Sequence, residues 1–181
     1  MRIIAGKWRG KVITAPPGDA TRPTSDRARE ALFSMLASRL GDFDGLRVAD
    51  LYAGTGALGL EALSRGAAHA TFVENDKVAI AVLKANITKC GGDAEATVLP
   101  QPVQAIGRAP APFDLLLLDP PYGEGHALPA LARLLEYGWI APHALISVET
   151  KKDETLDVPG FEIDVVRDHG KARLHLLRVA G

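Results

Sequence analysis

The sequence predicts an α/β domain built on a seven-stranded, mostly parallel sheet. From residue 46 onward, short apolar runs of strand length alternate with segments of helical periodicity, as in βα units joined by right-handed crossovers. Two of these runs end in sequences suited to chemistry: a glycine-rich turn follows residues 46–51, and Asp119-Pro120-Pro121-Tyr122 follows residues 113–118. Ligands bind at the carboxyl ends of strands in an open α/β sheet, so we expect both sequences at one edge of it.

The elements follow in a simple order along the chain. The predicted strands fall near 46–51, 69–74, 95–99, 113–118, 143–149, 161–167 and 172–179, and the predicted helices near 57–65, 77–89, 102–107 and 126–136. Only four residues separate the last two strands, which predicts a hairpin that adds an antiparallel edge to the sheet.

The first forty residues precede this pattern. Residues 1–14 alternate loosely between apolar and basic and predict a small β-hairpin, with Gly6 and Gly10 as turn candidates. A proline-containing loop covers 15–24, and Ser25 or Asp26 can cap a helix that runs to about Leu40. We therefore expect a basic extension over residues 1–24 and a main domain over residues 25–181.

The composition favours one soluble domain. The chain has 181 residues, is 47% hydrophobic and carries a formal net charge of −1, which suits a domain with a full core. No apolar run approaches the roughly 18 residues of a membrane span, and the N-terminus lacks the apolar region of a signal peptide. Cys90 cannot form an internal disulfide, and the five histidines show no metal-ligand spacing. We expect a cytoplasmic protein without a bound metal.

The charge is unevenly distributed. Residues 1–29 hold seven of the 21 basic side chains and two of the 22 acidic ones, which gives this segment a net charge of +5 against −6 for the rest. Such asymmetry indicates a docking surface for a polyanion, although a solvated basic tail would have the same charge. The residues that we expect to contact RNA are six cations and one aromatic side chain that could stack on a base: Lys7, Trp8, Arg9, Lys11, Arg22, Arg27 and Arg29.

The glycine-rich turn predicts a cofactor site of Rossmann-like type. Gly54, Gly56 and Gly59 have the spacing G-x-G-x-x-G between a strand and a helix, where glycine lets a ligand approach the backbone. Glu74 ends the next strand 20 positions after Gly54, the spacing at which an acid accepts hydrogen bonds from ribose hydroxyls. These residues alone leave the cofactor open between a nicotinamide dinucleotide and S-adenosylmethionine.

Asp50 favours S-adenosylmethionine over a dinucleotide. Its negative charge at the end of the first strand would repel a pyrophosphate but could orient a methionine ammonium group. The alternative is that Asp50 only caps the following helix. The residues that we expect to bind the donor are Asp50, Tyr52, Gly54, Thr55, Gly56, Glu74, Gln101 and Asp119, with Gln101 placed after the third strand, where it could reach the adenine edge.

The sequence Asp119-Pro120-Pro121-Tyr122 predicts a clamp for a planar amine. The lone pair of an aryl amine is delocalised into its ring, so the amine is a poor nucleophile. The Asp119 carboxylate and the Pro120 carbonyl can accept both N–H groups and favour a tetrahedral nitrogen, and the prolines hold the acceptors in place. Tyr122 can stack on the base. We therefore predict Asp119, Pro120 and Tyr122 as catalytic residues, whereas the alternative is a strand end with a packed tyrosine.

These sequences resemble the class I methyltransferases that modify exocyclic amines, and more closely the bacterial 16S ribosomal RNA guanine-N2 methyltransferases of the RsmD type. Many methyltransferases share the glycine turn and the Asp-Pro-Pro-Tyr sequence. The more specific likeness lies in residues 1–10 (MRIIAGKWRG), 22–30 (RPTSDRARE) and 56–65 (GALGLEALSR). The resemblance covers nearly the whole chain and implies a class I methyltransferase domain over residues 25–181.

The resemblance also implies an activity. S-adenosyl-L-methionine would be the donor, and the acceptor would be the 2-amino group of a guanine in 16S rRNA, within an assembled or assembling small ribosomal subunit. Arg22 to Arg29 would lie close to the site and contact donor or RNA, and we expect a monomer. Three alternatives stay open: an adenine-N6 nucleic-acid methyltransferase, a non-catalytic rRNA-binding assembly factor and a dehydrogenase. The first two share the sequence features of residues 1–29 or of residues 119–122.

Overall fold

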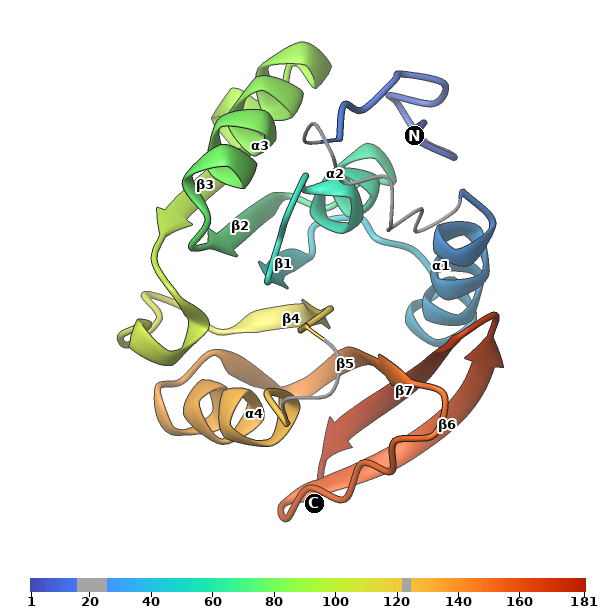
Figure 1. Cartoon of the computed structure of the whole chain (residues 1–181), viewed down its shortest axis with the longest axis vertical. Coiled ribbons are helices and arrows are strands. Elements are labelled where there is room, and N and C mark those ends of the chain that lie inside the picture. The colour runs from blue at the N-terminus through green and yellow to red at the C-terminus, as the bar shows by residue number, and fades with distance from the viewer. Residues whose placement is uncertain (16–25, 122–124) are drawn as a thin grey trace.

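A seven-stranded sheet forms the centre of the computed structural model, which describes residues 1–15, 26–121 and 125–181 (Figure 1). In spatial order the strands are β3 (Ala96–Pro100), β2 (His69–Glu74), β1 (Arg47–Leu51), β4 (Phe113–Leu118), β5 (Ile140–Lys151), β7 (Ala172–Val179) and β6 (Phe161–His169). In this order, the strands from β3 to β5 run parallel to one another, whereas β7 is antiparallel to both β5 and β6. The predicted mostly parallel sheet with an antiparallel hairpin at its edge is confirmed.

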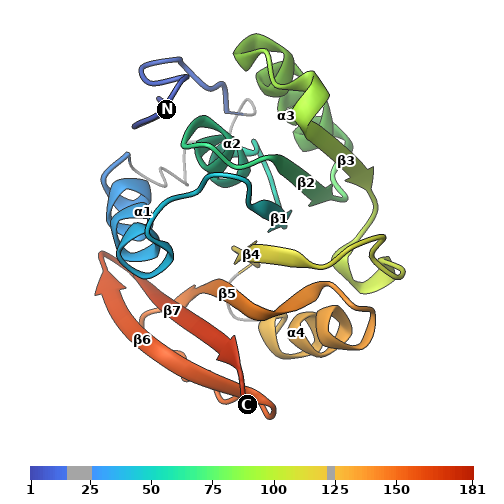
Figure 2. The same cartoon turned by 180° about the vertical axis from the view of Figure 1, so that it is seen from behind.

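The helices cover both faces of the sheet. A hydrophobic cluster lies on each face of the sheet. The helices α1 (Asp26–Leu40), α2 (Ala57–Ser64) and α3 (Lys77–Cys90) pack on one face, and α4 (Ala127–Glu136) packs on the other (Figures 1 and 2). Side chains alternate between these faces along β1, where Val48 belongs to the first cluster and Ala49 to the second. No helix among the described residues is long and apolar enough to cross a membrane.

The strand order reverses at β1, and this reversal positions the site. β2 pairs with one edge of β1 and β4 pairs with the other, with Leu51 opposite Leu118 in the second pair. The segments that follow these two strands therefore begin side by side, one of them at residue 52 and the other at Asp119. Such a reversal leaves a crevice beyond the carboxyl ends of the strands, where α/β proteins bind ligands.

Two predicted elements differ from the structure. The helix expected at 102–107 is only the 3₁₀ turn η2 (Val103–Ala105), since Ile106 is already extended and the segment is too short to form a helix. A second 3₁₀ turn, η1 (Asp93–Glu95), precedes β3. β5 begins at Ile140, three residues earlier than predicted, because the ladder with β4 shifts register between Phe113 and Leu115. Such an irregularity tolerates Pro142, which has no N–H for a ladder hydrogen bond.

The N-terminal segment packs onto the main domain. The predicted small hairpin is present in a minimal form: Arg2 and Val12 make one antiparallel bridge, with backbone hydrogen bonds from Ile3 N–H to Lys11 O at 2.9 Å and from Ile13 N–H to Met1 O at 2.8 Å. Ile3, Trp8 and Ile13 are buried in the same core cluster as α1 and α2. Burial of these three side chains adds tertiary contacts that fix the short hairpin beside α2.

Candidate functional site

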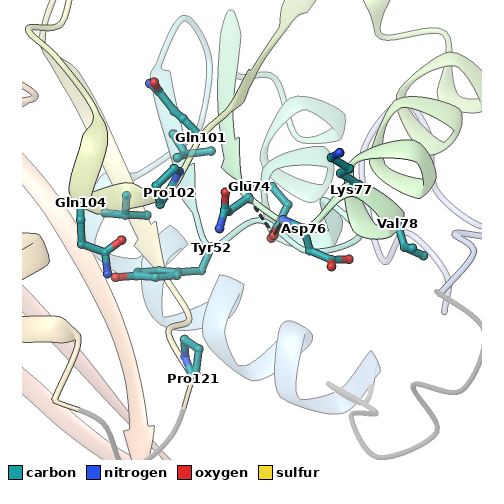
Figure 3. Close-up of a pocket in the computed structure, with 12 residues that line it drawn as sticks. Tyr52, Glu74, Asp76, Lys77, Val78, Gln101, Pro102, Gln104 and Pro121 are labelled. Atoms are coloured by element: carbon teal, nitrogen blue, oxygen red, sulfur yellow. Dashed lines mark hydrogen bonds between the residues drawn. The ribbon is translucent and has the colours of Figure 1, made fainter.

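The two sequences expected to carry chemistry meet at the carboxyl edge of the sheet. Asp50, Thr55 and Asp119 line one hollow of about 80 Å³. A larger cavity of about 550 Å³ lies beside it, above the ends of β2 and β3, and is lined by Tyr52, Glu74, Gln101 and Pro121 among others (Figure 3). The structure thus brings the predicted cofactor residues and Asp119 together at one edge of the sheet.

The three glycines of the turn serve different purposes. Gly54 has a φ of +57°, and a Cβ built on it would meet no atom within 4 Å, so its backbone is open to a ligand. A Cβ on Gly56 would lie 2.3 Å from Leu83 Cδ1, and one on Gly59 would lie 2.4 Å from a ring carbon of Phe72. Only the first glycine has an open face, whereas the other two allow α2 to pack closely on its neighbours.

Glu74 ties the glycine turn to the end of β2. One of its carboxylate oxygens accepts a hydrogen bond of 2.8 Å from Gly54 N–H. The other accepts bonds from the N–H groups of Asn75 and Asp76 at 2.9 and 2.8 Å, on the rim of the cavity in Figure 3. Each carboxylate oxygen has two lone pairs, so the group retains capacity for a ribose hydroxyl. Glu74 therefore holds the turn and still faces the larger cavity.

Asp50 is a buried carboxylate below the smaller hollow. It accepts a hydrogen bond of 2.9 Å from Gly59 N–H in the first turn of α2, so it does cap that helix. Burial raises its pKa well above the ordinary value, and the negative charges of Asp119 and Glu74 raise it further, against the opposing effect of the Gly59 hydrogen bond. Asp50 is thus a charge whose environment favours a cationic partner in the hollow.

Tyr52 combines an unfavourable backbone conformation with a hydroxyl that has no hydrogen-bond partner among the described residues. It is the non-glycine residue with a positive φ, 61°, in the described part of the chain, a conformation that costs free energy for an L-residue. Its hydroxyl is buried and has no hydrogen-bond partner among the described residues, and burial raises its pKa to about 12. In Figure 3 the Tyr52 ring extends across the cavity toward Gln104, a lining residue that was not predicted from the sequence.

Residues 119–121 separate the cavities described above from two hollows on the β5 side. Asp119 lines one of these hollows with Ser147 and Glu149. Pro120 and Pro121 line the other, again with Glu149. Tyr122 lies outside the described residues. Asp119 therefore lines both the hollow of Asp50 and the first hollow on the β5 side, which Glu149 lines with it.

The basic N-terminal residues divide into exposed and buried ones. Arg9 and Lys11 are exposed, and Lys7 forms an ion pair of 2.9 Å with Glu95 while retaining half of its side-chain surface. Trp8 is only 7% exposed and packs against Gly92, so the expectation that it stacks on RNA is corrected: its ring is part of the core. Three cations, Lys7, Arg9 and Lys11, thus remain available on this surface.

The cations of α1 divide in the same way. Arg27 is exposed, whereas Arg29 is fully buried and pairs with Glu61 at 3.2 Å and with Asp26. The expectation of an RNA contact by Arg29 is therefore corrected, because its guanidinium is committed to these carboxylates and to the Arg2 carbonyl at 2.8 Å. Arg29 nonetheless lines the hollow that holds Asp50 and Asp119. Arg22 lies outside the described residues.

Glu61 is a buried acid that sequence reasoning missed. It accepts hydrogen bonds from the N–H groups of Ile4 and Ala5 at 2.9 and 3.1 Å, and it pairs with Arg29 and Arg65. Its position inside an otherwise apolar helix is the signal that could have revealed it. The carboxylate joins the N-terminal segment, α1 and α2 at one point.

Asn86 is a second buried connector. Its amide accepts from Thr14 N–H and donates to the carbonyls of Thr14 and Thr55, each at 3.0 Å. Its partners therefore belong to the N-terminal segment and the glycine turn rather than to its own helix. Asn86 fixes both of them to α3.

Comparison with known proteins identifies the family. The model of the family described as Conserved hypothetical protein 95 matches residues 1–178. The Ribosomal RNA small subunit methyltransferase D of Haemophilus influenzae is 40% identical over 164 residues, which span 88% of this chain and 83% of that protein. The chain belongs to the RsmD family.

Two further relatives agree with this assignment. The protein of the same name from Escherichia coli K12 is 37% identical over 156 residues, 86% of this chain and 77% of that protein. A solved structure, the putative methyltransferase yhhF from Escherichia coli, matches with a TM-score of 0.86 at 34% identity and covers 99% of this chain and 97% of that one. The predicted Rossmann-like class I methyltransferase fold is confirmed for this RsmD-family chain.

Proposed function

We propose that this protein transfers a methyl group from S-adenosyl-L-methionine to the exocyclic N2 amine of a guanine in 16S rRNA of the small ribosomal subunit. Membership of the RsmD family and the names of its relatives support a small-subunit rRNA methyltransferase. The observation that carries the proposal is the shared hollow of Asp50 and Asp119, one suited to a cation and the other to an amine.

The cavity residues fit the donor. Asp50 would hold the methionine ammonium, Glu74 would accept from the ribose hydroxyls, and Gly54 offers an open backbone face to the ligand. The unpartnered hydroxyl of Tyr52 and the Gln101 amide provide polar groups at the adenine end. When bound, S-adenosylmethionine supplies a methyl group on a positively charged sulfur with a neutral thioether as leaving group, so the protein needs no strong base.

The acceptor side prepares the amine. The Asp119 carboxylate and the Pro120 carbonyl would accept the two N–H bonds of the guanine amine and favour a tetrahedral nitrogen with a localised lone pair. The amine would lose one proton on methylation, and the Asp119 carboxylate or water would accept it. Much of the acceleration then comes from holding nitrogen, methyl carbon and sulfur in line. Tyr122 is proposed to stack on the base, which must leave its own stack to enter.

The exposed cations of the N-terminal segment would bind the RNA. Lys7, Arg9 and Lys11 lie on one short segment, and Arg27 is exposed at the start of α1. Phosphates are recognised by cations of this kind without regard to sequence. We propose that this surface holds 16S rRNA within an assembled or assembling small subunit while one guanine enters the site of a monomeric enzyme.

A labelling experiment tests the proposal. The protein is incubated with methyl-labelled donor and small ribosomal subunits from cells that lack the enzyme, and the rRNA is digested to nucleosides. Release of labelled N2-methylguanosine is expected. Labelled N6-methyladenosine instead would identify an adenine-N6 methyltransferase. Binding of the particle with no transfer, by a protein that still binds donor, would identify a non-catalytic assembly factor.

A further inference from the structure

Glu149 stands beside Asp119 in neighbouring strands. β4 and β5 are neighbouring parallel strands (Figure 1). Leu118 is opposite Val148, so the residues that follow them, Asp119 and Glu149, continue the same register. Side chains in one row of a sheet point to the same face. Both carboxylates line the hollow on the β5 side, and Glu149 is half-buried there.

The position of Glu149 matches the edge of a base held at Asp119. Glu149 lines both hollows on the β5 side, the one that includes Asp119 and the one of about 140 Å³ that includes Pro120 and Pro121. The hollow of Asp50 adjoins the first of these, since Asp119, Arg29 and Leu58 line both, and the larger cofactor cavity lies farther away, above the ends of β2 and β3. If Asp119 and Pro120 hold the amine of a base, the ring atom next to that amine would lie on the side of Glu149.

The chemistry of that adjacent atom differs between the two amine-bearing purines. Beside its 2-amino group guanine has N1–H, a hydrogen-bond donor, whereas beside its 6-amino group adenine has N1 with a lone pair. A carboxylate accepts only, so it pairs with the first atom and repels the second. Of the other polar side chains at this hollow, Arg29 is committed to Glu61 and Asp26, whereas the Ser147 hydroxyl and the His169 ring can each donate or accept and so do not discriminate between the two bases.

We infer that Glu149 accepts the N1–H of the target guanine and thereby excludes adenine from the clamp. This inference rests on the proposed function. It makes Glu149 a specificity-determining residue, distinct from the clamp itself. It also explains how an Asp-Pro-Pro-Tyr sequence that suits either base selects one of them: a buried acceptor left facing a lone pair opposes the wrong base.

The test uses 2-aminopurine, which keeps the 2-amino group but carries a lone pair at N1. The wild-type protein first locates the methylated guanine, and small subunits are then reconstituted with guanine or 2-aminopurine at that position. The wild type is expected to methylate guanine with a kcat/KM at least about tenfold higher than for 2-aminopurine. Equal values for the two bases would overturn the inference without any variant.

The variant Glu149→Gln gives the second arm. Its amide can donate to N1 of 2-aminopurine, and its oxygen can accept from N1–H of guanine only without the assistance of a negative charge. The preference for guanine in kcat/KM is therefore expected to shrink, with a loss for guanine, a value held or raised for 2-aminopurine, and unchanged donor affinity. Equal losses on both bases would mean a merely structural role. Glu162→Gln, which neutralises an exposed acid of the same sheet, is the matched control and should behave as wild type. Absence of N2-methylguanosine with the wild type would instead refute the proposed function and the inference with it.

Discussion

At the scale of single residues, Asp50 shows a conflict between stability and binding. Its carboxylate is 1% exposed, and burial together with the nearby charges of Asp119 and Glu74 disfavours its ionised form. A group whose pKa is raised by folding favours the native state while it is protonated and opposes it once ionised, as pH rises through the raised pKa. A cationic ligand in the hollow would offset this cost. A buried acid at this position therefore indicates a binding site for a cation.

The variant Asp50→Asn should separate these two effects. The amide oxygen can still accept from Gly59 N–H, and the buried charge is gone, so the free energy of unfolding at neutral pH should stay equal or rise. Donor affinity should fall about tenfold or more, since a charge-assisted hydrogen bond contributes roughly 1.5–3 kcal/mol. Calorimetric titration with the donor and urea unfolding measure the two quantities.

The pH dependence of binding checks the same variant. Wild-type donor affinity should weaken as pH falls toward the raised pKa of Asp50, because protonation removes the negative charge that holds the ammonium group. Affinity of Asp50→Asn should vary less over that range. A variant that binds the donor as tightly as wild type would leave Asp50 as a helix cap only.

At the scale of elements, the N-terminal segment depends on contacts that are distant in sequence. Glu61, Ser64 and Asn86 hold it through backbone groups of residues 4–14. Sequence periodicity identified the strands and helices of the sheet because their patterns are local. It could not identify this docking, because each partner lies more than fifty residues away, although the alternating pattern of residues 1–14 did predict the short hairpin that is docked.

Gly6 is the tightest point of that docking. It has a φ of +90°, and a Cβ there would lie 1.9 Å from the Ser64 carbonyl oxygen, which also accepts from Lys7 N–H. Gly6→Ala should displace the segment, lower the free energy of unfolding by about 1–3 kcal/mol and expose residues 1–15 to protease. Limited proteolysis with mass spectrometry and urea unfolding measure this.

Gly10→Ala is the control for backbone strain alone. Gly10 has a similar φ of +84° but nothing lies within 4 Å of a Cβ built there. Its effect should be clearly smaller than that of Gly6→Ala. Equal effects would show that the contact with Ser64 does not hold the segment.

At the scale of the whole molecule, the exposed basic side chains and the residues that line the cavities come from different segments. Lys7 and Lys11 are exposed beside Glu95 and Lys89, near the end of α3 and the start of β3, while Arg29 and Trp8 serve the interior. The antiparallel edge of the sheet, the cofactor turn and the acid at the end of β2 were predictable from the sequence, because spacing alone determines them. Burial decided which of the basic and aromatic residues face outward, and composition cannot reveal burial.

The combined variant Lys7→Gln, Arg9→Gln and Lys11→Gln tests the RNA surface. RNA binding should weaken, and the plot of log affinity against log salt should flatten by about 0.7–0.9 for each phosphate that the protein no longer neutralises. Neutralising three exposed cations elsewhere, Lys84, Arg108 and Arg167, is the matched control. If both variants have the wild-type salt dependence, the N-terminal cations do not contact RNA.

Asp119 also lines the hollow of Asp50, but its main proposed role is to hold the acceptor amine, and the proposed mechanism depends on the donor being held chiefly by the other predicted cofactor residues. The decisive measurement compares the rate of methyl transfer and the dissociation constant of the donor in Asp119→Ala and wild type. Transfer should fall by about 10²–10³-fold, as when one preorganised hydrogen-bond partner of a reacting group is removed, with the donor dissociation constant changed less than about threefold. Retained transfer, or a fall in transfer explained wholly by weaker donor binding, would contradict this division of roles.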